Sequence, residues 1–298
     1  MNGCQPIVDS LLGGFRSLAD LLSVPGEWES RSSQTVPFSG GLLVVAHPDD
    51  ECLWFSSVLG RVDGTVICLQ GSSLRPGLGT ARRASLSILP LPGVVSLELD
   101  QADSFGGADW GKPQLNEYGI ALPNRPGAQE RYRQNFHELK NRLRPLLAGH
   151  RHVFTHSPWG EYGHEEHIQI HRVVQALQQE LSFHLWYPVY GSRKTLPLMR
   201  RQRLGPDAQL LNLKTDRALA NRLKGIYQVN QCWTWYLEWE GFPEESFVGQ
   251  SADDFAAGER GGKRLPCRFN RVEPPSDRGG VRNRIWGTHG RPCDASGR

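Results

Sequence analysis

The sequence of 298 residues lacks the marks of several protein classes. It has no apolar run of about 18 residues or more, so we expect no segment that crosses a bilayer. Its six cysteines include no CxxC pair, which argues against a thiolate zinc site and a disulfide-dense secreted fold. The first residues lack the basic start and clean apolar core of a signal peptide. A reducing cytoplasm is therefore the expected location.

The sequence also lacks a strong excess of one charge. The net charge is +3, and residues 251–298 hold ten Lys or Arg against six Asp or Glu, a balance of +4. The remaining residues therefore carry −1, so we expect no nucleic-acid partner for the body of the protein. No GxGxxG motif follows the first apolar run, which disfavours a nucleotide-binding module.

Short apolar runs and amphipathic stretches alternate along the chain. The runs predict strands at 41–47, 64–71, 94–100, 152–157 and 183–191. The amphipathic stretches predict helices at about 50–60, 80–88, 128–148 and 165–181. This alternation indicates an α/β fold: a mostly parallel sheet with helices on both faces and ligands beyond the carboxyl ends of the strands.

Composition divides the chain into three parts. Residues 1–38 are predicted to form a helical extension, and residues 39–250 the main domain. Residues 251–298 are rich in Gly, Pro and Arg without a period, which predicts a disordered basic tail. A basic arm that binds a partner is the alternative for this tail.

The first cluster of chemically active side chains is AHPDDE, residues 46–51, at the end of a predicted strand. Two adjacent aspartates repel each other, and burying either one alone is costly, so a cation between them would explain the pair. His47 and a carboxylate three positions later suit Zn²⁺. One aspartate could bind the metal while the other faces water as a general base. The alternative is an ordinary strand-to-helix turn with Asp49 as N-cap.

A second cluster, THSPWGEYGHEEHIQIHRVV (155–174), follows another predicted strand and should lie at the same edge of the sheet. His164, His167 and His171 are three and four positions apart, which puts them on one face of a helix. Such a histidine could complete the zinc site. His171, one turn further on, is expected to have a structural role. The alternative is a solvated helix that carries its histidines by chance.

Together, the two motifs resemble the PIG-L/LmbE-like zinc-dependent N-acetylglucosamine deacetylases over roughly residues 40–250. The resemblance implies a Rossmann-like fold and a bound Zn²⁺, with Fe²⁺ or another divalent metal as the alternative. It implies three metal ligands: His47, Asp50 and His167. It also implies three catalytic roles: Asp49 as general base, His164 as oxyanion stabiliser or proton donor to the leaving amine, and Tyr162 near the substrate carbonyl.

The resemblance extends less sharply to substrate contacts. An arginine that the family has after its second strand would be Arg82 or Arg83 here. An aspartate that holds sugar hydroxyls would be Asp103, with Asp100 as its competitor. Trp159 and Trp110 are expected to stack on a sugar, and the long loop 103–127 to shape the acceptor pocket. The aromatic-rich segment 226–249 is interpreted as a cap packed on the domain.

This chain departs from the family pattern at several positions. Ser157 stands where the family has an aspartate after a histidine, so His156 is expected to lie behind the ligands. Glu166 replaces an aspartate and could still polarise a histidine with its longer arm. Ser56 and Ser57 stand where a glycine pair is usual. None of these changes removes an expected ligand or the base.

The expected function is therefore metal-dependent removal of the acetyl group from an N-acetylated amino sugar, a GlcNAc-type glycoside or glycan. The products would be acetate and a free amine. A zinc hydrolase of another amide or ester, and a non-catalytic glycan-binding protein on the same fold, are the alternatives. Neither the sugar nor the oligomeric state follows from the sequence.

Overall fold

The structure is a computed structural model that describes residues 38–265 and 269–274. The expected helical extension over 1–38 thus lies outside the described residues except for its last position. Among the described residues, no helix is both long and apolar enough to span a bilayer.

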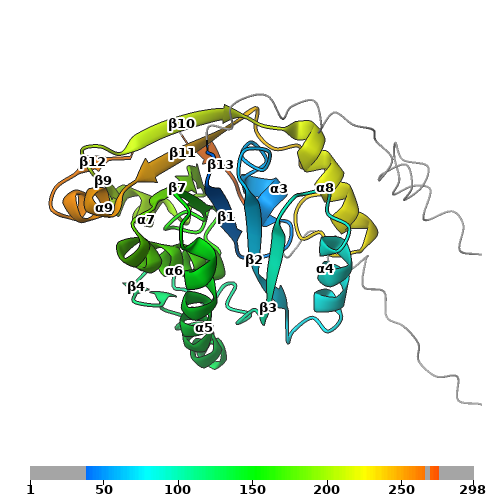
Figure 1. Cartoon of the computed structure of the whole chain (residues 1–298). Coiled ribbons are helices and arrows are strands. Elements are labelled where there is room, and N and C mark those ends of the chain that lie inside the picture. Colours follow the sequence, from blue (N-terminus) through cyan, green and yellow to red (C-terminus); the bar gives the residue numbers. More distant parts are fainter. Residues whose placement is uncertain (1–37, 266–268, 275–298) are drawn as a thin grey trace, which may run out of the picture.

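A seven-stranded sheet forms the centre of the molecule, in the order β10-β11-β7-β6-β1-β2-β3 (Figure 1). Its strands are β1 (Gly41–Val45), β2 (Gly64–Gly71), β3 (Val94–Asp100), β6 (His152–Thr155), β7 (His184–Pro188), β10 (Gln209–Lys214) and β11 (Glu244–Gln250). Five neighbouring strands, β7, β6, β1, β2 and β3, run parallel. Strand β11 is antiparallel to both β7 and β10. The predicted α/β fold with a mostly parallel sheet is confirmed.

Helices cover both faces of this sheet. They are α3 (Asp50–Trp54), α4 (Leu78–Leu86), α5 (Gln129–Leu147), α6 (Glu165–Leu181), α7 (Leu196–Arg201), α8 (Arg217–Val229) and α9 (Ala252–Glu259). Side chains alternate along β1, so Leu42 and Val44 pack with α5 and α6. Leu43 and Val45 point the other way and pack with α3 and α8. The central strands are apolar on both sides because each face is covered.

Short two-stranded pairings complete the fold: β4 (Leu115–Asn116) with β5 (Gly119–Ile120), β9 (Arg203–Leu204) with β12 (Lys263–Arg264), and β8 (Tyr190–Gly191) with β13 (Asn270–Arg271). A 3₁₀ turn, η2 (Pro126–Ala128), precedes α5. The β4–β5 hairpin lies within the long loop 103–127 and packs on α6.

The end of the main domain differs from the boundary predicted at residue 250. Helix α9 follows at once, and Ser251 and Asp254 form a reciprocal capping box at its start. Phe255 from this helix is buried against Tyr187 and His171. The tail prediction was wrong for this stretch because its Gly and Arg content hid a capping signal and one core aromatic.

Both expected motifs lie beyond the carboxyl ends of neighbouring strands. β1 ends at Val45 and leads to His47, while β6 ends at Thr155 and leads to His156. The two strands are paired in parallel, with Val44 opposite Thr155. The fold therefore brings together two segments that are more than one hundred positions apart in the sequence.

Candidate metal centre

The backbone at Asp49 turns sharply between β1 and α3. Asp49 has a left-handed φ of 104°, which is costly for a residue with a side chain and needs support from its surroundings. Glu51 supplies that support: its Oε2 accepts from the Asp49 backbone N–H at 3.0 Å, and its Oε1 accepts from the Tyr227 hydroxyl at 2.7 Å. Asp49 makes no side-chain cap bond to α3, so it is not an ordinary N-cap.

The Asp49 carboxylate is held instead from the far side of the site. Thr234 donates its backbone N–H at 3.1 Å and its hydroxyl at 2.6 Å, both to Asp49 Oδ2. Burial, followed by the charge of neighbouring Asp50, raises the pKa of Asp49 to about 6. An aspartate with this pKa is suited to taking up and releasing a proton near neutral pH.

His47 points one ring nitrogen at a carboxylate and the other into the site. Its Nε2 lies 2.8 Å from Glu166 Oε2, and because a carboxylate only accepts, Nε2 carries the proton. The Nδ1 lone pair then faces Asp50 Oδ2 at 3.3 Å. The expected contact between Glu166 and a histidine is present, and the histidine is His47.

His167 is arranged in the same way from the opposite wall. Its Nδ1 lies 2.6 Å from Glu161 Oε2, so this nitrogen carries the proton. Its Nε2 is buried, has no hydrogen-bond partner among the described residues, and lies 3.3 Å from Asp50 Oδ1. The ring centroids of His47 and His167 are 5.5 Å apart. Buried polar atoms are normally paired, so a buried lone pair that accepts no hydrogen bond is a candidate metal ligand.

Asp50 stands between the two histidines and is ionised. Burial alone would raise its pKa, but the neighbouring rings of His167 and His156 hold the pKa of Asp50 well below its ordinary value. Its Oδ2 also accepts from the His47 backbone N–H at 2.7 Å, and its Oδ1 from Trp54 Nε1 at 3.1 Å. These bonds fix the carboxylate in place between the rings.

Two further histidines border the centre, but their hydrogen bonds use the nitrogens that a metal would need. The Ala46 backbone N–H donates to His156 Nε2 at 2.9 Å. Burial lowers the pKa of His156, whereas the charges of Glu161 and Asp50 raise it. The Ala46 N–H can donate to Nε2 only if that nitrogen has a lone pair, so this contact requires the neutral ring. His164 Nδ1 accepts from the Glu166 backbone N–H at 3.2 Å, which leaves Nε2 as the N–H of the neutral ring. Burial and the nearby rings of His167 and His47 hold the pKa of His164 well below its ordinary value.

The donor set fits a divalent ion. Ligand atoms of His47, His164 and His167 lie within 4.8 Å of one another, as do those of Asp50, His156 and His167. Once the lone pairs used by Ala46 and by the Glu166 N–H are removed, three groups remain: His47 Nδ1, Asp50 and His167 Nε2. Two imidazoles and a carboxylate suit Zn²⁺, and each imidazole is oriented by a second carboxylate. His171, as expected, is structural: its Nδ1 donates to the His156 carbonyl at 2.7 Å.

A pocket of about 450 Å³ opens beside this centre. Its lining includes His47, Asp49, Asp50, His164 and Tyr162. The Tyr162 ring lies 5.6 Å from His167 and 5.9 Å from His164, centroid to centroid. Burial raises the pKa of Tyr162 well above its ordinary value, so its hydroxyl keeps its proton.

The expected substrate contacts separate into those at the pocket and those away from it. Arg82 lines the pocket and is buried, with Nη1 donating to the carbonyl of Gln70. Arg83 lies on the surface near Glu98, 3.5 Å away, and is not part of the pocket lining. Asp103 lines the pocket, but its oxygens already accept from residues of the 72–74 turn and from Gln101.

Trp159 does not reach the pocket, and the expectation that it stacks on a sugar was wrong. Its ring is fully buried, its Nε1 donates to the Tyr190 carbonyl, and it packs edge-on against Tyr187. Trp110 is also absent from the pocket lining; its Nε1 donates to Glu165. The aromatic lining comes from Phe105 and Tyr162 and, in the expected cap segment, from Trp233, Trp235 and Tyr236.

The long loop 103–127 is tied to the metal centre through one side chain. The Glu165 carboxylate accepts from the backbone N–H groups of Gly106 and Ala108 and from Trp110 Nε1, at 3.1–3.2 Å. Glu165 is the first residue of α6, two positions before His167. Loop and ligand are thus held by the same helix turn.

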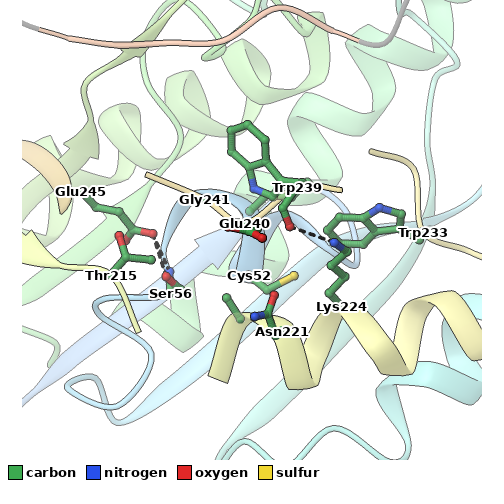
Figure 2. Close-up of a pocket in the computed structure, with 12 residues that line it drawn as sticks. Cys52, Ser56, Thr215, Asn221, Lys224, Trp233, Trp239, Glu240, Gly241 and Glu245 are labelled. Atoms are coloured by element: carbon green, nitrogen blue, oxygen red, sulfur yellow. Dashed lines mark hydrogen bonds between the residues drawn. The ribbon is translucent and has the colours of Figure 1, made fainter. Parts of the chain in front are cut away.

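A much smaller cavity lies behind the aromatic segment (Figure 2). Its volume of about 10 Å³ has room for roughly one water molecule. Lys224 donates to the Trp239 carbonyl at 2.8 Å and holds the segment to α8. Glu245 accepts from the N–H and O–H groups of Ser56 and Ser57, so the two serines connect the end of α3 to β11.

Two residues of the site were not anticipated from the sequence. Glu161 lies in the turn before α6, and its residue type alone does not distinguish it from an acidic residue on the surface. Thr234 is 185 positions from the aspartate it contacts, and no local pattern links the two.

Comparisons with known proteins place these features in context. No protein-family model matches the chain. Over 163 residues the chain is 28% identical to the 1D-myo-inositol 2-acetamido-2-deoxy-alpha-D-glucopyranoside deacetylase of Mycobacteroides abscessus. The match covers 48% of this chain and 56% of the relative, so the chain spans about half the length of that relative. This relative confirms the resemblance to the PIG-L/LmbE-like deacetylases.

Two solved structures with low sequence identity align with most of the chain. One is a deacetylase–bog complex in the biosynthesis pathway of teicoplanin, with 15% identity, a TM-score of 0.43, and coverage of 72% of this chain and 99% of that one. The other is the zinc-inhibited form of a teicoplanin deacetylase, with 15% identity, a TM-score of 0.42 and the same coverage.

Proposed function

We propose that the protein is a metal-dependent hydrolase that removes the acetyl group from an N-acetylated amino sugar. The observation that carries this proposal is the convergence of His47 Nδ1, His167 Nε2 and the Asp50 carboxylate beside a separately held aspartate. The relative named above is a deacetylase of an acetamido-sugar, which supports the same reaction.

Three residues would hold the ion: His47, Asp50 and His167. When bound, a divalent ion such as Zn²⁺ would supply a Lewis acid that polarises the amide carbonyl and lowers the pKa of water. The nitrogens that face away from the ion, His47 Nε2 and His167 Nδ1, lie within hydrogen-bond distance of Glu166 and Glu161.

Asp49 would act as the general base. Both donors from Thr234 bind Oδ2, so Oδ1 is the oxygen that would take the proton from the attacking water. Asp49 lines the pocket beside Asp50, where a pKa of about 6 leaves it mostly ionised at neutral pH.

Tyr162 and His164 would stabilise the oxyanion that forms on the acetyl carbonyl. Both line the pocket, and both present a proton: the Tyr162 hydroxyl and the N–H at His164 Nε2. Asp49, after it has accepted a proton from the water, would return it to the departing amine. His164 could do so only as the imidazolium, which its lowered pKa and the hydrogen bond to its Nδ1 disfavour, so its Nε2–H is left to the oxyanion. The C–N bond breaks, and the acetyl group leaves as acetate.

The rest of the pocket would hold the sugar. Arg82 is the candidate from the arginine pair, and Asp103 offers oxygens at the pocket wall. The 450 Å³ volume exceeds the acetyl group alone and leaves room for the sugar and part of its aglycone.

The test is acetate release from a panel of N-acetylated sugars and glycosides by the zinc-loaded full chain, followed by mass spectrometry. Loss of one acetyl group from a panel member, absent in Asp49→Asn protein of equal zinc content, would support the proposal. Hydrolysis of simple esters or other amides with no action on any acetamido-sugar would instead indicate a hydrolase of another specificity.

A further inference from the structure

Glu161 is a buried acid at a place where the backbone does not favour one. It lies in the turn before α6 with a left-handed φ of 52°, and its side chain is fully enclosed. A non-glycine residue is held in this conformation only where its surroundings require it, and such positions cluster at functional sites. The surroundings of Glu161 are therefore informative.

The Glu161 carboxylate joins two histidines. Its Oε2 lies 2.6 Å from His167 Nδ1 and 3.1 Å from His156 Nδ1, and its Oε1 accepts from the Ser157 backbone N–H at 2.7 Å. The two imidazoles are stacked, with centroids 3.9 Å apart and planes inclined by 23°. One oxygen thus orients two rings at once.

This bridge decides which nitrogens face the centre. Because the carboxylate accepts from both Nδ1 atoms, both rings turn Nε2 toward Asp50, at 3.3 Å for His167 and 3.4 Å for His156. Ala46 already donates to His156 Nε2, whereas His167 Nε2 has no partner among the described residues. The bridge therefore leaves one buried lone pair without a hydrogen-bond partner among the described residues, on His167 Nε2.

We propose that Glu161 is the positioning residue that fixes His167 in its metal-binding tautomer and thereby sets the affinity for the divalent ion. The same carboxylate also holds the His156 ring, which stacks on the ring of His167 and does not bind the ion. The inference rests on the metal site of the proposed function, but it concerns binding of the ion and does not depend on which substrate is hydrolysed.

A purely structural role for Glu161 makes a different prediction. If the carboxylate only fills a buried space between two rings, its replacement would lower stability without changing the affinity for the ion. If it orients His167, a neutral replacement of the same shape would weaken metal binding even in a folded protein. Metal affinity therefore separates the two roles.

The experiment compares Zn²⁺ affinity of the full chain and of Glu161→Gln, by competition with a chromophoric chelator at fixed pH. We expect binding to weaken by roughly 10- to 100-fold, the range for groups that orient a ligand histidine. The Co²⁺-loaded variant should also show a shifted visible absorption spectrum. Unchanged affinity in a variant with native circular dichroism would overturn the proposal.

Glu245→Gln is the matched control. Glu245 is equally buried and accepts several hydrogen bonds, but its partners are serines on the far side of α3 and no histidine. We expect this variant to lose stability while its Zn²⁺ affinity stays within about twofold of the parent protein. A loss equal to that of Glu161→Gln would assign the effect to general destabilisation and overturn the proposal.

A second measurement needs no variant. Long-range ¹H–¹⁵N spectra of the metal-free parent protein report the tautomer of each imidazole. The proposal requires the proton of His167 on Nδ1, and a proton on Nε2 would contradict it. Proteins that bind Zn²⁺ through this tautomer but release no acetate would refute the proposed function and leave this inference standing.

Discussion

The pocket has two sides that are built in opposite ways. The side from the β1 and β6 strand ends is buried and dense with charged groups, and hydrogen bonds hold His47, Asp50 and His167 in place. The side from residues 231–238 is aromatic and partly open, and Tyr236 and Leu237 keep 39% and 37% of their surface exposed. A buried, hydrogen-bonded side of the pocket thus faces a partly exposed aromatic side. Thr234 connects the two through its hydrogen bonds to Asp49.

This contrast predicts that substitutions on the two sides change different quantities. Residues of the charged side should control metal binding and the rate of the chemical step. Residues of the aromatic side should control substrate affinity.

His167→Ala should abolish turnover by removing a ligand. We expect Zn²⁺ affinity to fall by more than the roughly 100-fold typical of groups behind the ligands. The parent protein should gain thermal stability on adding Zn²⁺, because an ion that binds only the folded state stabilises it, by about 2.7 kcal/mol at 100 times Kd. A variant that keeps its zinc on dialysis would remove His167 from the ligand set.

Asp49→Asn should keep the ion and lose turnover. A general base contributes roughly 10²–10⁴-fold to the rate, and asparagine tolerates the left-handed backbone that Asp49 adopts. Zinc content by atomic absorption and kcat on the same sample give the comparison. Equal kcat in variant and parent would exclude Asp49 as the base.

The pH dependence of kcat/KM should report the ionisation of Asp49. The base works only when ionised, so kcat/KM should fall about tenfold per pH unit below the pKa of Asp49, which is about 6 before an ion is bound. A bound cation favours the ionised form and should move this limb to lower pH. A limb that lies above pH 7 and persists in Asp49→Asn would belong to another group.

Thr234→Val should lower kcat with unchanged Zn²⁺ affinity. The variant loses the hydroxyl bond to Asp49 Oδ2 and keeps the backbone one, and a bond to a charged group is worth about 1.5–3 kcal/mol. A roughly tenfold fall in kcat follows if half of that acts on the transition state. Thr234→Ser, which retains the hydroxyl, should recover most of the rate, and failure to do so would argue for packing instead.

Two aromatic residues should give the mildest and most contrasting effects. Tyr236→Ala removes an exposed ring from the pocket wall and should raise KM several-fold, about 1 kcal/mol, without loss of stability. Trp159→Phe leaves the Tyr190 carbonyl without its donor and should lower the free energy of unfolding by about 1–3 kcal/mol, with KM unchanged. Exchange of these two outcomes would reverse the assignment of the two rings.

Sequence patterns predicted the parts of the molecule that depend on near neighbours. The strands at 64–71 and 94–100 and the helix at 165–181 have the predicted bounds, because turn residues and periodicity mark them locally. Histidine and carboxylate spacing likewise predicted which side chains gather at the strand ends. Helix α8 and the antiparallel strands β10 and β11 were not predicted as elements, since their patterns were weaker than the aromatic content around them.

What could not be predicted depends on contacts between distant segments. Thr234 reaches Asp49 only because α8 returns the chain to the pocket, and no spacing rule encodes that path. Trp159 follows the same strand as His156 and His164, yet its side chain is buried in the core, and residue type alone does not tell inward from outward. The contacts of Glu161 depend on where the rings of His156 and His167 lie, and the sequence does not specify those positions.

The anchoring of loop 103–127 by Glu165 has a consequence for how the protein could diversify. Three loop donors end on one carboxylate at the start of the helix that carries His167, while the hairpin of β4 and β5 lies further along the loop. The loop residues that line the pocket are Asp103, Phe105 and Arg125, and no residue of the hairpin does so. Substitutions in the hairpin can therefore accumulate without altering the pocket. A substitution of Trp110 would instead remove one of the three donors to Glu165, whereas Gly106 and Ala108 contribute backbone N–H groups that most substitutions retain.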